Sequence, residues 1–337
     1  MRIAFLLVSL IGMTVNAQNN YNLLVGTYTN ECKSEGIYVY DFNVATLEFK
    51  AKGNTHGIVN PSYLCVSKDN SVVYSVNEDG NKSGVSAFKY TPANGKLNLL
   101  NAKDSQGADP CYIINDDKNV IVANYTGGSV AVFGKKQDGS LTDVKQVVQH
   151  SGNSINKERQ EKAHVHMVHF SPDKKYLFVN DLGTDKISIY NYNPDGGNNT
   201  LTLKESITVK AGSGPRHLVF HPNGIFFYVL HELDASLSVY SYIKEKVELI
   251  QETTIVSEGF VGAVGAADIH FSNDGKFIYA TNRGDANSIS VFRVHANGRM
   301  NLVQRISTQG SSPRNFTIDP TDNYVLVANQ KTNNISI

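Results

Sequence analysis

The chain has 337 residues, with 31 Lys plus Arg against 31 Asp plus Glu, so its formal net charge is zero. It shows no basic excess or basic stripe, which argues against a nucleic-acid-binding protein. Its 27 glycines, 17 tyrosines and 15 phenylalanines suit many short strands joined by glycine-containing turns.

The N-terminal stretch predicts a secretory signal peptide at residues 1–17. Arg2 gives a positive start, residues 3–13 are apolar, and Val15-Asn16-Ala17 resembles a small-residue cleavage site. The apolar run is short for a bilayer span, and no later stretch is apolar enough to cross a membrane. We therefore expect an exported protein, periplasmic or extracellular, whose mature part at residues 18–337 is a single, monomeric domain.

Six similar units follow one another at intervals of about 50 residues, a spacing typical of propeller blades. Each has an apolar strand, a turn, a second apolar strand and, in most units, two more strands; the units start at Pro61, Pro110, Val165, Pro215, Ala266 and Pro313. A partial unit at residues 21–53 lacks the innermost strand. The sequence thus predicts an all-β, seven-bladed β-propeller with four antiparallel strands per blade. Because residue 337 falls inside the third strand of the last unit, we expect the domain to be truncated at its C-terminus, with its closing strands missing and strand edges left unpaired.

The unit at residues 212–233 shows where chemistry is expected. Arg216 stands at the start of its first strand and Glu232 at the end of its second, so a tight hairpin brings them together on one rim. The matching positions in the other units form two columns of unlike residues. The first column is Ser62, Cys111, His166, Arg216, Ala267 and Arg314; the second is Tyr28, Glu78, Tyr125, Asp181, Glu232, Arg283 and Gln330.

One position before the second column, five units share an asparagine. These residues are Asn77, Asn124, Asn180, Asn282 and Asn329, and His231 is the exception. A position on which repeats agree is structural, and we expect these side chains to bond the turns between blades.

The unlike columns predict a charged opening of the channel. Two readings remain: the side chains pair as rim salt bridges, Arg216 with Glu232 and Asp181 with Arg283, or they form an anion-binding catalytic pocket. Arginine binds carboxylate or phosphate with two parallel hydrogen bonds, and histidine suits acid–base work near neutral pH.

Other chemistries find little support. No GxSxG or GxxxxGK[ST] motif occurs. His164 and His166 share a strand face, with His169 on the other, but no further metal ligand has a recognised spacing, so no metal site is predicted. No cofactor is predicted, and the three cysteines imply no disulfide framework. The polar stretch 150–163 is long enough to be a functional loop or lid.

Several segments together resemble the lactonase seven-bladed β-propeller family, which includes 6-phosphogluconolactonases and fungal carboxymuconate cycloisomerases. They are GTYT (26–29), PSYL (61–64), NYTGGSVAVF (124–133), HVH (164–166), GSGPRHLVFHPNG (212–224) with HEL (231–233), NRG (282–284) and SPRNF (312–316). The resemblance implies a metal-independent site in the propeller mouth. It places the family's histidine on His166, with His164 adjacent, its arginines on Arg216 and Arg283, and its acid on Glu232. Val165 stands where the family often has proline, which leaves this strand start less rigid.

The expected function is hydrolysis of an anionic sugar lactone such as 6-phosphogluconolactone. Arg216 and Arg283 would hold the substrate and polarise its carbonyl, and either His166 or Glu232 would be the base. The predicted substrate-binding residues are His164, Arg314, Asp181 and Tyr125. Two alternatives remain: a cycloisomerase of an unsaturated diacid, and a binding propeller without catalysis.

Overall fold

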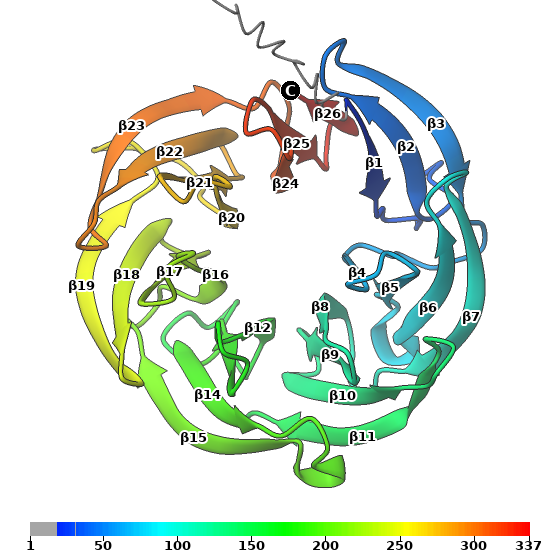
Figure 1. Ribbon diagram of the computed structural model, residues 1–337. Helices are drawn as coiled ribbons and strands as arrows, with labels where there is room; N and C mark the ends of the chain where they lie inside the picture. The colour runs from blue at the N-terminus through cyan, green and yellow to red at the C-terminus, as the bar shows by residue number, and fades with distance from the viewer. Residues whose placement is uncertain (1–18, 31) are drawn as a thin grey trace, which may run out of the picture.

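The computed structural model describes residues 19–30 and 32–337, so the expected signal peptide at residues 1–17 lies outside the described residues. The described chain forms seven antiparallel sheets arranged in a ring (Figure 1). Consecutive strands are neighbours in every sheet, and each sheet runs from the ring centre outwards. The prediction of a seven-bladed β-propeller is confirmed.

Five blades contain four strands each. They are β4 (Leu64–Val66), β5 (Val72–Asn77), β6 (Gly84–Thr91) and β7 (Lys96–Asp104); β8 (Pro110–Asn115), β9 (Asn119–Asn124), β10 (Ser129–Lys135) and β11 (Leu141–Gln149); β12 (Val165–Phe170), β13 (Tyr176–Asp181), β14 (Lys186–Tyr192) and β15 (Leu201–Thr208); β16 (Pro215–Phe220), β17 (Phe226–His231), β18 (Ser236–Ile243) and β19 (Lys246–Thr254); and β20 (Ala266–Phe271), β21 (Phe277–Asn282), β22 (Ser288–Val294) and β23 (Met300–Ser307).

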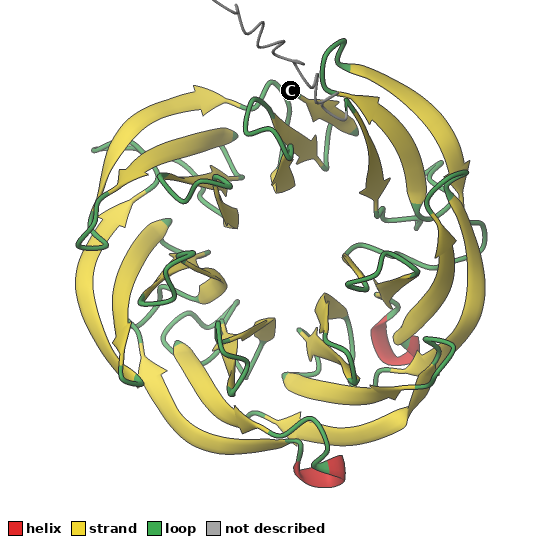
Figure 2. Ribbon diagram, in the orientation of Figure 1, coloured by secondary structure: helices red, strands yellow, loops and turns green. Residues whose placement is uncertain are grey.

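The first and seventh blades have three described strands each. The first holds β1 (Asn20–Val25), β2 (Tyr38–Asn43) and β3 (Glu48–Asn54), and the seventh holds β24 (Pro313–Ile318), β25 (Val325–Asn329) and β26 (Asn334–Ser336). Short 3₁₀ helices, η1 (Gly80–Lys82) and η2 (Gly197–Asn199), are the helical elements of the described residues, as Figure 2 shows. None of the described helices has the length and apolarity needed to cross a bilayer.

The core lies between the blades. Second strands are covered on both faces by neighbouring blades, and every residue of β9 and β17 is buried. Phe178 of β13 meets Phe227 of β17 with ring centroids 5.3 Å apart, an edge-to-face contact across two blades. Outer strands alternate between exposed and half-buried positions, as in β19. This layering holds the inner strands, and therefore the channel mouth, on a rigid frame.

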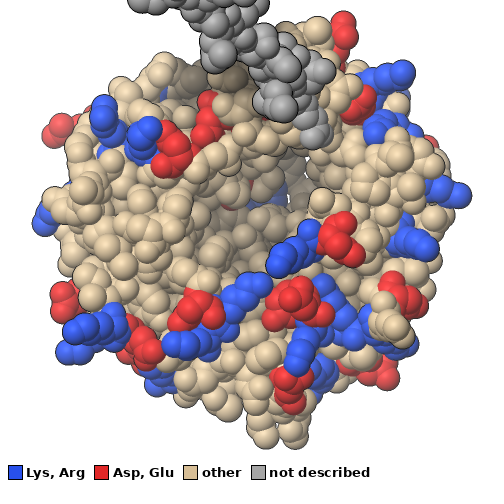
Figure 3. All heavy atoms as spheres, viewed as in Figure 1, with Lys and Arg blue, Asp and Glu red and all other residues tan. Residues whose placement is uncertain are grey.

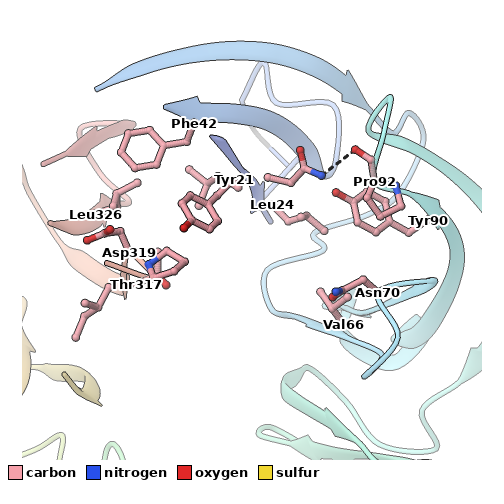
Figure 4. A pocket seen from close by; sticks show the side chains of 14 residues that line it. Tyr21, Leu24, Phe42, Val66, Asn70, Tyr90, Pro92, Thr317, Asp319 and Leu326 are labelled. Atoms are coloured by element: carbon pink, nitrogen blue, oxygen red, sulfur yellow. Dashed lines mark hydrogen bonds between the residues drawn. The ribbon is translucent and has the colours of Figure 1, made fainter. Parts of the chain in front are cut away.

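The inner edge of β1 has no pairing partner among the described strands. A cavity of about 430 Å³ lies beside it, lined by residues of the first, second and seventh blades (Figure 4). Tyr21, Phe42 and Leu326 form part of its apolar wall, and Asn22 Nδ2 donates to Pro92 O at 2.8 Å on the opposite side. The predicted absence of an innermost strand from the first blade is confirmed for the described residues.

The ring is hollowed at its centre, and charges of both signs are mixed around the face seen in Figure 3. Lys and Arg do not gather there into one large basic patch. This distribution agrees with the zero net charge of the sequence.

The shared asparagines connect each blade to the loop that leads into it. Asn124 Nδ2 donates to Ser105 O at 3.2 Å, and Asn329 Nδ2 donates to Thr308 O at 3.1 Å. Asn77 Nδ2 donates to Val59 O in the same way, at 3.2 Å, whereas Asn282 uses its Oδ1 to accept from the backbone N–H of Gly265 at 3.0 Å. The buried Asn180 amide has no hydrogen-bond partner within the described chain. The predicted structural role is confirmed for four of the five positions.

His231 occupies the asparagine position of the fifth blade and makes the fold sensitive to acid. Burial lowers its pKa from 6.5 to about 4. As pH falls below 6.5 the unfolded chain takes up this proton before the folded chain does, so the free energy of unfolding decreases. Between about pH 7 and pH 5 this one group is expected to remove about 2 kcal/mol of stability.

Replacing His231 with Asn, the residue of the other blades, should therefore remove about 2 kcal/mol of the pH dependence. Urea unfolding of the wild type and of His231→Asn near both pH values measures it. His56→Asn is the matched control, because the side chain of His56 is 70% exposed. An unchanged difference in stability between the two pH values in His231→Asn would contradict the assignment.

Candidate active site

β-Bulges direct the first column of side chains towards the channel mouth. The register of β12 with β13 shifts between Val165 and Met167, and the equivalent shift in β16 spans Arg216. The bulges of β8 and β24 span Cys111 and Arg314. A bulge bends its strand and re-aims a side chain. The first-column residues therefore lie at bulges, where side chains no longer alternate regularly between the two faces of the strand.

Glu232 is the centre of the mouth cluster. Its Oε2 accepts a hydrogen bond from Arg216 Nε at 2.9 Å and forms an ion pair with Arg283 Nη2 at 3.0 Å. Its Oε1 accepts from Arg159 Nη2 at 2.6 Å. The predicted neighbourhood of Arg216 and Glu232 is confirmed, but the carboxylate binds three arginines rather than one.

The three guanidinium groups keep Glu232 ionised. Burial alone would raise the pKa of this carboxyl group, but Arg283, Arg216 and Arg159 outweigh it and lower the pKa to about 2. Burial lowers the pKa of Arg283 to about 10, with Glu232 opposing and Arg216 and Arg314 adding to the decrease. The four side chains thus carry three positive charges and one negative charge at neutral pH. Such an excess favours an anion.

Hydrogen bonds to groups other than Glu232 also orient Arg216. Its Nη1 donates to Ala267 O and to His217 Nε2, the latter at 3.1 Å. His217 Nδ1 lies 2.9 Å from Asp268 Oδ1. Burial and the charge of Arg216 lower the pKa of His217 to about 4, so its ring is neutral, with Nδ1–H donating to Asp268 and Nε2 free to accept from Arg216.

His166 faces the Glu232 cluster as a neutral imidazole. Its Nε2 lies 3.9 Å from Glu232 Oε2, and its ring makes edge-to-face contacts with Tyr125 and His217. Burial, together with Arg216, His217 and Arg314, lowers its pKa well below 6.5. A neutral, buried histidine can accept a proton, and an adjacent carboxylate stabilises the imidazolium that results.

Arg314 lies in a second acidic group of the mouth. Its guanidinium is 5.5 Å from the ring centroid of Tyr28, whose hydroxyl donates to Glu78 Oε1 at 3.0 Å. Ser62 Oγ donates to the same carboxylate oxygen. Burial raises the pKa of Glu78, although Arg314, Ser62 and Tyr28 oppose it. Glu78, Tyr28 and Ser62 all belong to the two predicted columns but were not predicted as site residues.

Tyr125 and His164 form the wall beside His166. The rings of Tyr125 and His164 stack at 4.6 Å, and the Tyr125 hydroxyl accepts from Arg159 Nη2 at 3.1 Å. His164 Nε2 lies 3.1 Å from Glu161 Oε1. Both predicted substrate-binding residues therefore border the cluster.

Asp181 faces away from the arginines. Its Oδ2 lies 3.0 Å from His150 Nδ1, and its Oδ1 accepts from the backbone N–H groups of His164 and Gly183. The expected alternative in which Asp181 pairs with Arg283 is wrong, because Arg283 binds Glu232 instead. Asp181 anchors the start of the 150–163 loop and is a supporting residue.

Arg159 is a further site residue that sequence reasoning missed, and it lies outside the two predicted columns. It comes from the 150–163 loop, 73 residues before Glu232, and no repeat position predicts it. The only available signal was the length and polarity of that loop. A metal cluster is not found: among the described residues no group of three or more His, Cys, Asp or Glu side chains has a metal-binding arrangement.

Comparison with known proteins gives relatives that cover nearly the whole chain. The family model described as "Lactonase, 7-bladed beta-propeller" matches residues 22–337. A protein of Formosa agariphila named 6-phosphogluconolactonase is 37% identical over 94% of this chain and 91% of its own length. A protein of the same name from Bacillus subtilis is 35% identical over 92% of this chain and 88% of its own length.

A solved structure agrees in fold as well as in sequence. The periplasmic gluconolactonase of Pseudomonas aeruginosa superposes with a TM-score of 0.88 at 35% identity, covering 94% of each chain. The fold, the order of the motifs and these matches lead to one assignment. The chain belongs to the lactonase family of seven-bladed β-propellers.

Proposed function

We propose that this protein is a lactone hydrolase that opens an anionic sugar lactone of the 6-phosphogluconolactone type in the mouth of the propeller. The observation that carries the proposal is Glu232, held by three arginines, with the neutral His166 beside it. The relatives named 6-phosphogluconolactonase and gluconolactonase support the same chemistry.

In the proposed reaction His166 removes a proton from water as the water oxygen attacks the lactone carbonyl carbon. Arg216 and Arg283 stabilise the negative charge that develops on the carbonyl oxygen. The bond between that carbon and the ring oxygen then breaks, and the His166 imidazolium returns its proton to the departing oxygen, giving the hydroxy acid. Glu232, with its pKa of about 2, is a poor base and stays ionised throughout, where it holds the arginines and stabilises the imidazolium.

The proposed reaction is metal-independent and takes place in an exported monomer. The signal pattern at residues 1–17 and a periplasmic relative support export. An exported enzyme would meet unphosphorylated or carboxylated sugar lactones more readily than a phosphorylated metabolite.

A substrate panel tests the proposal. We expect the full chain to accelerate hydrolysis of sugar lactones, with turnover unchanged by a chelator, and to leave an unsaturated diacid such as carboxymuconate unreacted. Cyclisation of the diacid without lactone hydrolysis would identify a cycloisomerase. Binding of lactones or sugar acids without any turnover would identify a binding propeller.

A further inference from the structure

The 150–163 loop brings one arginine to the mouth from outside the repeat. Arg159 Nη2 donates to Glu232 Oε1 at 2.6 Å and to Tyr125 Oη at 3.1 Å. The first of these partners belongs to the fifth blade and the second to the third, whereas the loop itself leads into the fourth. Arg159 thus joins three consecutive blades at the channel opening.

The loop holds Arg159 in place through its own polar contacts. Asn156 Oδ1 accepts from the backbone N–H groups of Glu158 and Arg159, both at 3.1 Å. Gln160 is fully buried, and its Nε2 donates to Leu182 O at 2.9 Å. Ser154 Oγ donates to Asp185 Oδ2 at 2.5 Å. The loop is therefore anchored by hydrogen bonds before and after Arg159, and these contacts hold the guanidinium at the mouth.

Arg159 differs from the other two arginines on Glu232 in its accessibility. Its side chain is 43% exposed, against 3% for Arg216 and 16% for Arg283. Arg216 and Arg283 also donate to backbone carbonyl groups of the channel wall. Arg159 uses only Nη2, and its Nε and Nη1 have no hydrogen-bond partner in the described part of the chain. Arg216 and Arg283 each have one guanidinium nitrogen without a partner in the described residues, whereas Arg159 has two and the most exposed side chain of the trio.

We propose that Arg159 recognises the anionic substituent of the lactone, a phosphoryl or carboxylate group, and sets the preference for charged over neutral lactones. This inference rests on the proposed function and adds to it the residue that selects the substrate. The free Nε–H and Nη1–H groups of Arg159 can each donate a charge-assisted hydrogen bond to such an anion. Arg216 and Arg283, which are more deeply buried, are left to act on the reacting carbonyl group.

The test compares Arg159→Met with the wild type on three lactones: 6-phosphogluconolactone, a glucarolactone with a free carboxylate, and the neutral gluconolactone. Loss of the contact with Glu232 lowers turnover of all three alike, so the readout is the ratio of kcat/KM for a charged lactone to that for the neutral one. We expect this ratio to fall about tenfold or more, mainly through KM, and Arg159→Lys to recover part of it. The phosphorylated and carboxylated arms show which anion the site prefers.

Lys157→Met is the matched control, because it removes the same charge from an exposed position of the same loop. It should keep the wild-type ratio. An Arg159→Met variant that also keeps the wild-type ratio would overturn the inference, since a purely structural role affects every lactone equally. An equal fall of the ratio in Lys157→Met would also overturn the inference, because it would show that the loss of any positive charge from this loop has the same effect.

A separate binding measurement distinguishes a failure of this inference from a failure of the proposed function. Calorimetry with the ring-opened acids, 6-phosphogluconate, glucarate and gluconate, requires no turnover. If the wild type opens no lactone, the proposed function fails, and the calorimetry still decides the role of Arg159. We expect Arg159→Met to lose affinity for 6-phosphogluconate or glucarate relative to gluconate. Equal affinities in variant and wild type would contradict the role.

Discussion

Replacing Glu232 with Gln is expected to lower kcat/KM for lactone hydrolysis by about a thousandfold or more. The substitution removes the only negative charge among three guanidinium groups, two of which are largely buried. Arg216 and Arg283 then repel each other and leave the positions from which they would stabilise the developing negative charge. The His166 imidazolium also loses the neighbouring carboxylate. Arg216→Ala is expected to have a comparable effect, because it removes one of the two donors.

Stability must be measured alongside this loss. Removing one partner of a buried ion pair costs about 3–5 kcal/mol, so Glu232→Gln is expected to unfold at lower urea concentration while remaining folded at neutral pH. Leu237→Ala gives a matched control: Leu237 is fully buried in the same blade, and its truncation costs a similar free energy of about 2–5 kcal/mol. Near-wild-type turnover in Leu237→Ala assigns the loss in Glu232→Gln to chemistry. Near-wild-type turnover in Glu232→Gln and Arg216→Ala would refute the proposed site.

Replacing His166 with Gln is expected to lower kcat by about a hundred- to ten-thousandfold, the usual contribution of a general base. The wild-type pH profile carries a second signature. Because burial and nearby positive charges hold the pKa of His166 well below 6.5, the base stays neutral as pH falls through that value. Activity should therefore persist below pH 6.5 and decrease only in more acidic solution. The residual rate of the variant should instead rise with hydroxide concentration.

His169→Gln is the control for this substitution. His169 lies on the same strand, but its ring packs against Phe220, 5.8 Å between centroids, away from the Glu232 cluster. It should retain turnover and the wild-type pH profile. The assignment fails if His166→Gln keeps the acidic limb of the wild-type profile, or if both histidine variants lose activity equally.

The repeat made the ring of blades predictable. Each unit has the same order of apolar strands and turns, and burial between neighbouring blades requires that pattern in every unit. The same register placed Arg216 and Glu232 together, since a hairpin fixes which strand ends meet. The bulges at His166, Arg216 and Arg314 could not be derived from the pattern, because they interrupt the regular alternation on which a prediction of strand faces depends.

Partners across the mouth were less predictable than positions on the rim. The repeat columns predict which residues lie at the same depth in the channel. They do not predict which of these side chains contact one another, because those contacts depend on the conformations of the loops. Asp181 lies at its predicted repeat position, but its carboxylate contacts His150 of the preceding loop and not Arg283. Arg159 reaches Glu232 by the path of an irregular loop that no periodicity describes. Glu78 was visible in its column, and its pairing with Ser62 and Tyr28 required the packed blades.

The most direct test of the central claim, that the mouth cluster opens a lactone ring, is the initial rate of lactone hydrolysis by the purified full chain, with Glu232→Gln measured in parallel. The lactones are the phosphorylated, carboxylated and neutral sugar lactones of the substrate panel, and the uncatalysed rate is subtracted. We expect the wild type to accelerate at least one charged lactone, and Glu232→Gln to fall close to the uncatalysed rate. A wild type that stays at the uncatalysed rate for every lactone, or a variant that equals the wild type, would contradict the claim.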